Sequence, residues 1–564
     1  MSYPRRRIIN LLKKAIPEEV EIDLTVPEEE KFGHFSTNIA FILAKLRNKN
    51  SLEVAQEIAL KVKSYTKTDL IEKIEVVPPG FINFELTPKA IQRIFVEILK
   101  SKIDFFKPKL KTKKKKVVVI DYSHPNIAKP MSVAHLRSTI IGQALYNIFK
   151  FAGFKTIGDN HLGDWGKQFG VLIAAFKEKK RSFKDVTVKD LMDLYVDYTK
   201  RMNENPLLEE KAREETKKLQ MGDKENIKIW KKFYQISLAE FKKIYKILKV
   251  DFDYYLGESF YKPMLEEVVK EALKKGVAKK SQGAVVIDTG RGTPFIIQKS
   301  DGSYLYSTTD IAAVKYRIKK FKADLILYVV DSGQSLHFEH LFDSVRLLNY
   351  VKNQELVHVK FGLVLSEDLK KLSTRAGRFI SLEKLISEAI VKAKEIVSKK
   401  QPTLSDREKD KIAKIIGIGA LKYNDLSQNR LSNISFNWSK MLNLEGNSAP
   451  YLQYTYVRLK SILRKKSIQK FDPSDLKEKA ELDLIFHLSE FPEVIKRITK
   501  TYYPHFLANY LYELAKRANV FYETIPVLKS DSRIRNSRLA LVKTVAMALK
   551  TGLNLLGIET LERM

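Results

Sequence analysis

A β-branched run, Val117–Ile120, followed by a polar turn and then a helical pattern, constrains this chain more than any other segment. The run is apolar enough for a buried strand, and an amphipathic helix pattern continues to about Phe151. Strand, polar turn and helix together form the opening of a nucleotide-binding α/β unit, in which the first N–H groups of the helix bind phosphates. The sequence therefore predicts a doubly wound, Rossmann-like α/β domain.

Length and charge limit the classes of protein to which the chain can belong. Its 564 residues predict three or four domains. A formal net charge of +34 favours nucleic acid as a partner, although a solvated lysine-rich surface is an alternative interpretation. Without cysteine the chain forms no disulfides, thiolate zinc sites or cysteine nucleophiles. Because we find neither a membrane span nor a secretory leader, we expect a cytoplasmic protein.

The residue patterns change twice along the chain. An α+β pattern comes first, with a strand expected at Val20–Val26, and helical spacing dominates after Ser381. Between them, strands of a sheet are expected at Val117–Asp121, Lys155–Asn160, Leu325–Val330 and Val357–Val364. The expected regions are an α+β domain at 1–106, a basic linker at 107–116, an α/β domain at 117–381 with an insertion at about 178–300, and an all-α bundle at 382–564.

The polar turn and the start of its helix carry the chemistry. Residues 123–143 read Ser-His-Pro-Asn-Ile-Ala-Lys-Pro-Met-Ser-Val-Ala-His-Leu-Arg-Ser-Thr-Ile-Ile-Gly-Gln. This segment resembles the "HIGH" element of class I aminoacyl-tRNA synthetases, and it is similar to arginyl-tRNA synthetases in particular. The resemblance implies that Ala134 and His135 contact ATP, and that Gly142 permits close helix packing. Ser132 and Ala134 stand where the family usually has histidine and glycine, so we expect weaker ATP contacts rather than inactivity.

A second ATP element of this class is a mobile Lys-Met-Ser-Lys-like loop. Lys371-Leu372-Ser373-Thr374 stands in its place, and the second lysine is missing. The resemblance implies that Lys129, just upstream of the HIGH-like element, compensates for this lysine. The residues expected to act in catalysis are Lys129, His135 and Lys371. Those expected to bind ATP are Ser132, Ala134, His135, Gly142, Lys371 and Ser373, with Mg²⁺ bound to the ATP rather than to the protein.

Selection of arginine requires recognition of a planar cation. A carboxylate binds a guanidinium through two parallel hydrogen bonds, and an aromatic ring lies against its face. Tyr306 and Asp310 are four residues apart and share a face if a helix starts there, although Asp310 as a helix N-cap is the alternative. By resemblance, the arginine-binding residues are His124, Pro125, Asn126 and His135 at the amino-acid end, and Tyr306, Asp310 and Gln334 at the side chain.

Two further segments contain candidate ligand-binding residues. Asn160–Gly170, which reads Asn-His-Leu-Gly-Asp-Trp-Gly-Lys-Gln-Phe-Gly, also resembles the arginyl family, with packing as the alternative role. His337 and His340 have the i,i+3 spacing of metal ligands, but they lie on a helical pattern with no cysteine nearby. We therefore expect no zinc.

Both ends of the chain resemble the RNA-binding domains of arginyl-tRNA synthetases. The N-terminal domain resembles the one that meets the tRNA elbow, and the helical end resembles the anticodon-binding bundle. Aromatic and polar side chains on a basic surface suit unstacked bases and phosphates, although many of these aromatic residues must belong to the core. The candidate tRNA-binding residues are Phe35, Asn38, Asn83, Tyr451, Gln453, Tyr454 and Arg458.

Three interpretations compete. The first is an arginyl-tRNA synthetase, which forms arginyl-adenylate from ATP and arginine and transfers the arginine to tRNA. The second is another adenylating enzyme with the same catalytic fold, and the two RNA-type terminal domains argue against it. The third is an inactive RNA-binding paralogue, suggested by Ser132 and Ala134; retention of Lys129, His135, Lys371, Asp310 and Gln334 argues against it. We favour the enzyme and expect it to be a monomer.

Overall fold

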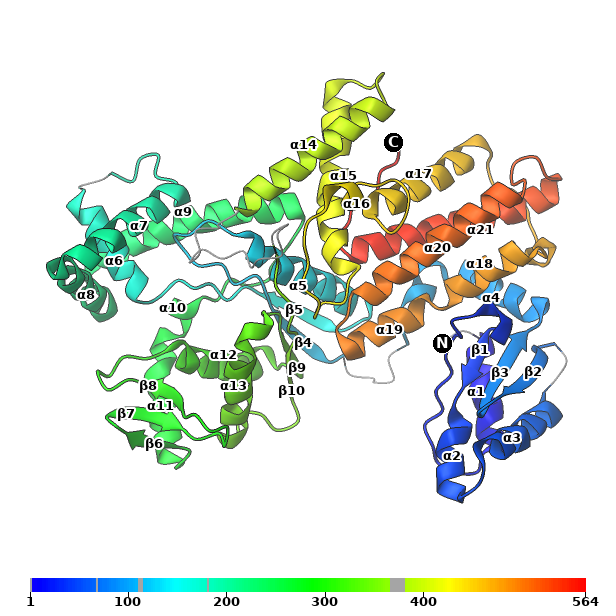
Figure 1. Cartoon of the computed structure of the whole chain (residues 1–564), viewed down its shortest axis with the longest axis horizontal. Coiled ribbons are helices and arrows are strands. Elements are labelled where there is room, and N and C mark those ends of the chain that lie inside the picture. The colour runs from blue at the N-terminus through cyan, green and yellow to red at the C-terminus, as the bar shows by residue number, and fades with distance from the viewer. Residues whose placement is uncertain (1–2, 67–68, 110–114, 180–181, 366–380, 564) are drawn as a thin grey trace.

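The computed structural model describes residues 3–66, 69–109, 115–179, 182–365 and 381–563. Three regions follow one another along the chain: a small domain with an antiparallel sheet, a parallel-sheet core, and a bundle of helices (Figure 1). In Figure 1 the N-terminal domain lies at the lower right, below the helical bundle, and the parallel sheet lies near the centre. The fold class predicted from the sequence is confirmed.

The N-terminal domain is built on a three-stranded antiparallel sheet with the order β1-β3-β2. The expectation of a strand at Val20–Val26 is wrong, because within that segment only Thr25 pairs, in an isolated bridge with Ser36. Pro17 and Pro27 flank the segment, and a proline supplies no N–H for a ladder. The elements are α1 (Tyr3–Ala15), η1 (Glu30–Phe32), β1 (Phe35–Thr37), α2 (Ile39–Arg47), α3 (Ser51–Tyr65), β2 (Ile71–Val77), β3 (Phe81–Leu86), α4 (Pro88–Ser101) and η2 (Lys102–Phe106).

The central sheet is parallel and has the order β10-β9-β4-β5. Every residue of β4 is buried, as the β-branched run predicts for a central strand. The strand order reverses between β4 and β9, and ligands of such sheets bind at the carboxyl edge beside this reversal. The elements are β4 (Val117–Asp121), α5 (Val133–Phe151), β5 (Lys155–Asp159), α12 (Tyr306–Phe321), β9 (Leu325–Tyr328), η4 (Ser332–Gln334), α13 (Ser335–Leu347) and β10 (Glu355–His358).

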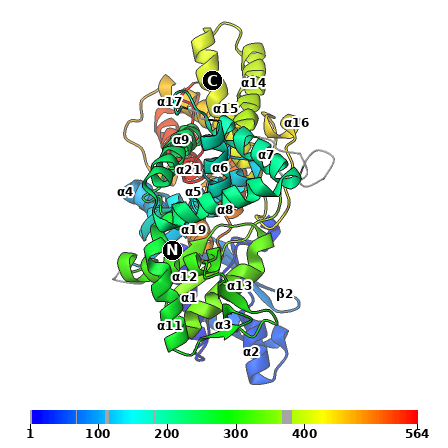
Figure 2. The same cartoon turned by 90° about the vertical axis from the view of Figure 1, so that its left-hand side faces the viewer.

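Between β5 and α12 the chain leaves the sheet. Long helices come first and gather at one end of the molecule, the end that faces the viewer in Figure 2. A small antiparallel sheet with the order β6-β7-β8 follows, in the stretch where the sequence indicated β structure. The elements are α6 (Lys167–Glu178), α7 (Val188–Glu204), α8 (Pro206–Met221), α9 (Lys224–Leu248), α10 (Glu258–Tyr261), η3 (Lys262–Met264), α11 (Leu265–Lys274), β6 (Ala278–Ser281), β7 (Ala284–Ile287) and β8 (Phe295–Gln298).

The C-terminal region is helical and is tied to the core by buried polar contacts. Lys422 donates hydrogen bonds to the carbonyl oxygens of Leu248, at the end of α9, and of Gly557, just after α21. Among the described helices none is apolar enough over a sufficient length to span a bilayer. The elements are α14 (Leu382–Lys400), α15 (Asp406–Leu426), α16 (Trp438–Met441), α17 (Ala449–Lys465), η6 (Pro473–Asp475), α18 (Lys479–Ser489), α19 (Phe491–Thr501), α20 (His505–Thr524) and α21 (Ser532–Leu555).

Candidate active site

The turn after β4 holds an unusual backbone. Ser123, His124 and Ala128 have φ angles of 84°, 52° and 62°, which lie in a left-handed region that residues other than glycine rarely adopt. The Ser123 hydroxyl lies 2.8 Å from the hydroxyls of Thr139 and Tyr245, which fixes the start of the turn. Strained backbone of this kind persists where the surroundings determine it, and it is concentrated at functional sites.

The helix α5 begins directly after this turn, with Ser132 as its N-cap residue. The N–H of Ser132 donates to Nδ1 of His135 over 3.0 Å, so the ring proton of the neutral imidazole is on Nε2. Burial lowers the pKa of His135 to about 4, which keeps the ring neutral near pH 7. Ala134 is exposed beside it. This helix start therefore offers backbone N–H groups and an imidazole donor to an anion.

Lys129 lies on the other side of the turn, against the inserted helices. Its ammonium is 5.1 Å from the centre of the Tyr195 ring in α7, and burial lowers its pKa. The neighbouring N–H of Ala128 donates to the Ser237 hydroxyl in α9 over 2.9 Å. The insertion thus holds the turn, and the expected compensating lysine, in place.

Two carboxylates at the ends of β4 and β5 share one buried guanidinium. Nη2 of Arg317 in α12 lies 2.7 Å from Oδ2 of Asp121 and 2.8 Å from Oδ2 of Asp159. The other oxygen of Asp121 binds Nε2 of His124 at 2.8 Å. Burial opposes ionisation of Asp121, but Arg317 and His124 outweigh it and hold its pKa well below the usual range. Burial raises the pKa of Asp159 to about 6.

Several buried polar atoms around this guanidinium have no hydrogen-bond partner among the described residues. Buried polar groups are nearly always paired, so such a cluster indicates a site for a polar ligand or for ordered water. These atoms include Oδ1 of Asn160, Nδ1 of His161 and the hydroxyl of Tyr261.

Asp310 lies one turn into α12 and faces α13. Its Oδ2 is 2.7 Å from Nε2 of His337, and the ring of Tyr306 lies 4.9 Å from the His337 ring. Gln334 is exposed just before α13. Glu258 is a second carboxylate near Asp310: burial and the charges of Asp164 and Asp310 raise its pKa to about 8. Tyr306 and Asp310 thus lie in the first turns of α12 and both contact His337, with the Glu258 carboxyl group close enough to interact with Asp310.

The segment after β5 packs against the turn. A methyl group on Gly163 would lie only 2.1 Å from Oδ1 of Asn126, so this glycine lets the two loops meet. Pro125 accepts a hydrogen bond from the Gly163 N–H, which fixes the same contact. Gly142 plays a similar part in α5, because a methyl group there would lie 2.3 Å from Cγ of Tyr122. Both glycines serve close packing.

The second ATP element lies outside the described residues, which include neither Lys371 nor Ser373. The described residues on either side of it are held by hydrogen bonds, and those on the C-terminal side contact the start of α5. Ser381 forms a bridge with Ser132, and the N–H of Leu382 donates to the carbonyl of Met131 over 2.9 Å. On the other side, residues 362–365 hydrogen-bond to residues 430–434, which follow α15.

Sequence reasoning missed several residues of this site. Asp121 ends a buried strand at the carboxyl edge of a parallel sheet, and that position was a usable signal. Glu258 and Arg317 gave no such signal, since each reaches the site from a distant helix. His337 shows in the sequence only the i,i+3 spacing of a metal ligand, with His340. Among the described residues no three His, Cys, Asp or Glu side chains are grouped to hold a metal ion.

The candidate RNA-binding residues differ in exposure. Phe35, Asn83 and Gln453 are buried, and Gln453 donates to the carbonyl of Glu559 over 2.7 Å, so the fold gives these three a packing role. Tyr451 is half-buried, and its hydroxyl accepts a hydrogen bond from Asn519 over 2.6 Å. The exposed candidates are Asn38 at the start of α2, Tyr454, and Arg458, whose guanidinium covers the Tyr522 ring at 4.5 Å.

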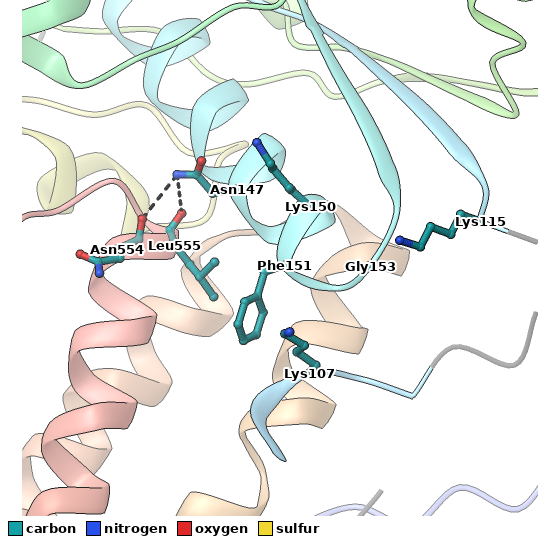
Figure 3. A pocket seen from close by; sticks show the side chains of 8 residues that line it. All are labelled: Lys107, Lys115, Asn147, Lys150, Phe151, Gly153, Asn554 and Leu555. Atoms are coloured by element: carbon teal, nitrogen blue, oxygen red, sulfur yellow. Dashed lines mark hydrogen bonds between the residues drawn. The ribbon is translucent and has the colours of Figure 1, made fainter. Parts of the chain in front are cut away.

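A groove of about 540 Å³ lies apart from this site, where the linker, the end of α5 and the end of α21 meet (Figure 3). Lys107, Lys115 and Lys150 line it. The Lys107 ammonium is paired with Asp104 at 2.7 Å, and Asn147 donates to the last carbonyls of α21. The negative end of a helix and a paired lysine make this groove a poor anion site.

Comparison with known proteins places these elements in families. The family described as "tRNA synthetases class I (R), catalytic domain" matches residues 96–438, beyond the boundary expected at 381. The "Arginyl tRNA synthetase N terminal domain" matches residues 5–86, and the "DALR anticodon binding domain" matches residues 452–564.

Individual proteins are similar over their whole lengths. Arginine–tRNA ligase of Fusobacterium nucleatum is 41% identical over 580 aligned residues, which cover 100% of both chains. The arginyl-tRNA synthetase structure from Plasmodium falciparum is 30% identical with a TM-score of 0.84, covering 99% of this chain and 98% of the other. That from Thermus thermophilus, 23% identical, shares the fold with a TM-score of 0.83 over 99% of this chain and 100% of its own. The chain belongs to the arginyl-tRNA synthetase family of class I aminoacyl-tRNA synthetases.

Proposed function

We propose that this protein attaches L-arginine to tRNA in two steps. The arginine carboxylate attacks the α-phosphorus of ATP, forming arginyl-adenylate and releasing pyrophosphate, and the terminal ribose of the tRNA then attacks the adenylate. One observation carries the proposal. At one edge of the sheet, the start of α5, which is suited to phosphates, is combined with the carboxyl groups of Asp310 and Glu258, which are suited to a guanidinium.

The protein's part in the first step is to position the reactants and to stabilise negative charge. ATP phosphates would lie at the start of α5, where the neutral His135 donates through Nε2 and Lys129 supplies a positive charge. Lys371 and Ser373 are proposed to complete this site, and Mg²⁺ would be bound by the ATP phosphates. The low pKa of His135 matters here, because it keeps the ring neutral with Nδ1 accepting from Ser132 and Nε2–H free to donate to a phosphate oxygen.

Arginine would lie along the carboxyl edge of the sheet. Its amino-acid end would meet His124 and Asn126, beside the Asp121 carboxylate, and its guanidinium would meet Asp310 with Tyr306 against its face. A site that satisfies a guanidinium rejects citrulline and lysine, because its carboxylates would be left without matching donors.

The tRNA would reach this site while contacting both ends of the chain. The exposed Tyr454 and Arg458 of α17 are proposed to face the anticodon, and Asn38 of the N-terminal domain the tRNA elbow. Because the ATP, arginine and RNA elements all lie on one chain, we propose that a monomer is the functional unit. Since charged tRNA is used in translation, we place the reaction in the cytoplasm.

The test is aminoacylation of tRNA with each of the twenty amino acids, together with ATP–pyrophosphate exchange with and without tRNA. We expect charging by arginine alone, and exchange that requires tRNA. Charging by a different amino acid would refute the assignment of the Asp310 pocket. Tight tRNA binding with neither charging nor exchange would identify an inactive paralogue. Size-exclusion chromatography with light scattering tests the monomer.

A further inference from the structure

We propose that His337 is a specificity-determining positioning residue, which sets the plane of the Asp310 carboxylate before the guanidinium arrives. This proposal deepens the proposed function and rests on it. It assigns to His337 no part in the chemical step, because within the described part of the chain its side chain hydrogen-bonds to Asp310, at the side-chain end of the amino-acid site.

The contact between the two residues is short and well shielded. Nε2 of His337 lies 2.7 Å from Oδ2 of Asp310, and the side chains are only 11% and 21% exposed. An ionised carboxylate accepts and cannot donate, so the ring donates through Nε2–H. Hydrogen bonds to a charged acceptor are stronger than those between neutral groups. The histidine thus occupies one lone pair of Oδ2. Oδ1 and the second lone pair of Oδ2 are left to accept the two parallel hydrogen bonds of the substrate guanidinium.

Aromatic neighbours hold the His337 ring. The ring of Tyr306 lies 4.9 Å away, that of Phe295 in β8 5.5 Å away, and that of Phe338 5.4 Å away in an edge-to-face arrangement. Rings at such distances prefer particular orientations and leave little room for another rotamer. Tyr306 therefore has two roles: its ring is expected to lie against the substrate guanidinium, and it also packs against His337, which orients the Asp310 carboxylate.

A fixed carboxylate matters more for arginine than for other cations. A guanidinium is planar and forms two parallel hydrogen bonds with an acceptor that lies in its plane, whereas an ammonium binds as a point charge in many orientations. Fixing Asp310 in advance removes the loss of rotamer freedom that binding would otherwise require. The gain therefore favours arginine over lysine.

The charges around Asp310 also favour its contact with His337. Burial is the main cause of the raised pKa of Glu258, and the charges of Asp164 and Asp310 raise it further, so Glu258 and Asp310 repel each other when both are ionised. The N–H of His337 meets Asp310 from α13 and offsets part of this repulsion. Without it, Asp310 is free to turn away from Glu258 and from the position of the guanidinium.

The neighbouring His340 does not share this role and provides a matched control. Its Nδ1 lies 2.7 Å from the hydroxyl of Thr289, and its ring stacks on Phe295 at 5.4 Å. Both histidines thus lie on α13 and touch the same phenylalanine, but only His337 binds Asp310. A purely structural role of the pair would make the two replacements equivalent.

The experiment compares His337→Phe, His337→Gln and His340→Phe with the wild type, all as full-length chains. Phenylalanine keeps a ring among the aromatic neighbours and removes the donor, whereas the Gln amide places an N–H near the position of Nε2. The measurements are kcat and KM for arginine, KM for ATP and for tRNA, inhibition by lysine and citrulline, and the thermal unfolding midpoint.

We expect His337→Phe to raise the arginine KM roughly ten- to a hundredfold, the range for a lost hydrogen bond to a charged group, with kcat and the ATP KM within about threefold. His337→Gln should restore most of the affinity, and His340→Phe should leave the arginine KM near that of the wild type. An unchanged arginine KM in His337→Phe overturns the proposal, as does an equal effect of His340→Phe. If His337→Phe does not fold, His337→Leu takes its place as the variant without a donor. An arginine KM in His337→Gln as high as that in His337→Leu then overturns the proposal. Failure of the wild type to charge arginine refutes the proposed function instead.

Discussion

The guanidinium of Arg137 in α5 binds the carboxylate of Asp425 in α15, and the two side chains are 0% and 1% exposed. Arg137 Nε and Nη2 lie 2.9–3.2 Å from the carboxylate oxygens, and the same guanidinium donates to the carbonyls of Ser432 and Arg430. Because Arg137 lies two residues beyond His135, the helical region is attached to the helix that carries the proposed ATP site.

Breaking this pair should cost stability. Asp425→Asn leaves the buried guanidinium without a counter-charge, and we expect a loss of roughly 3–5 kcal/mol in the free energy of unfolding. Urea denaturation followed by circular dichroism measures it. The control is Asp410→Asn. Asp410 lies in α15, like Asp425, but forms an exposed pair with Lys394 of α14, so its replacement should change stability by less than about 1 kcal/mol. Equal effects of the two replacements would contradict the interpretation of the buried pair.

The affinity for arginine should depend on pH through Glu258. Its pKa is raised to about 8, so the carboxyl group holds a proton below that pH, and a guanidinium favours the ionised form. Binding therefore releases a proton, and the arginine KM should fall as the pH rises from 6 to 8. Steady-state charging at several pH values measures this slope.

The matched variant for this prediction is Glu258→Gln, which should raise the KM and remove the slope. Glu266→Gln, at an exposed glutamate paired with Lys270, should preserve the slope. A slope that survives in Glu258→Gln would mean that another group titrates.

Lys129→Ala should slow adenylate formation. Removing a preorganised positive charge near the phosphates should reduce the rate of pyrophosphate exchange about 10²- to 10³-fold. Lys150→Ala, at the far end of α5, should leave the rate unchanged. If Lys129→Ala weakened only tRNA binding, the compensating role of this lysine would be wrong.

Gly142→Ala should destabilise the core. The added methyl group would lie 2.3 Å from the ring of Tyr122, so either the ring or α5 must shift, at a cost of about 1–3 kcal/mol. Thermal and urea unfolding check this value. Replacing Tyr122 by Ala should make the added methyl group nearly harmless, and strictly additive losses in the double variant would refute the clash.

The sequence was most informative where a local pattern and a local structure coincide. The β-branched run became β4, and the helical pattern to Phe151 became α5, because burial on both faces and helical periodicity are visible in neighbouring residues. Val20–Val26 shows the limit of such local patterns. Its composition suits a strand, but prolines flank it and it pairs only through the single bridge of Thr25 with Ser36. The family assignment is confirmed.

The candidate site could be predicted only in part, because much of it depends on contacts between distant segments. Asp121 and Arg317 are 196 residues apart, and Asp310 and His337 are 27 apart. No periodicity encodes such pairs. Burial is equally hidden: Phe35 and Gln453 look like surface candidates in the sequence, yet the N-terminal and C-terminal cores enclose them.

The helix α12 carries Asp310 near its start and Arg317 seven residues later. Seven residues of α-helix rise about 10.5 Å, and this rise does not change when a ligand binds. Since Arg317 holds Asp121 beside the proposed amino-acid end and Asp310 marks the side-chain end, one rigid helix sets the spacing between them. In the proposed binding mode, α12 therefore fixes the length of substrate that the site accepts. Analogues one methylene shorter or longer than arginine would contact either the amino-acid end beside Asp121 or Asp310, but not both.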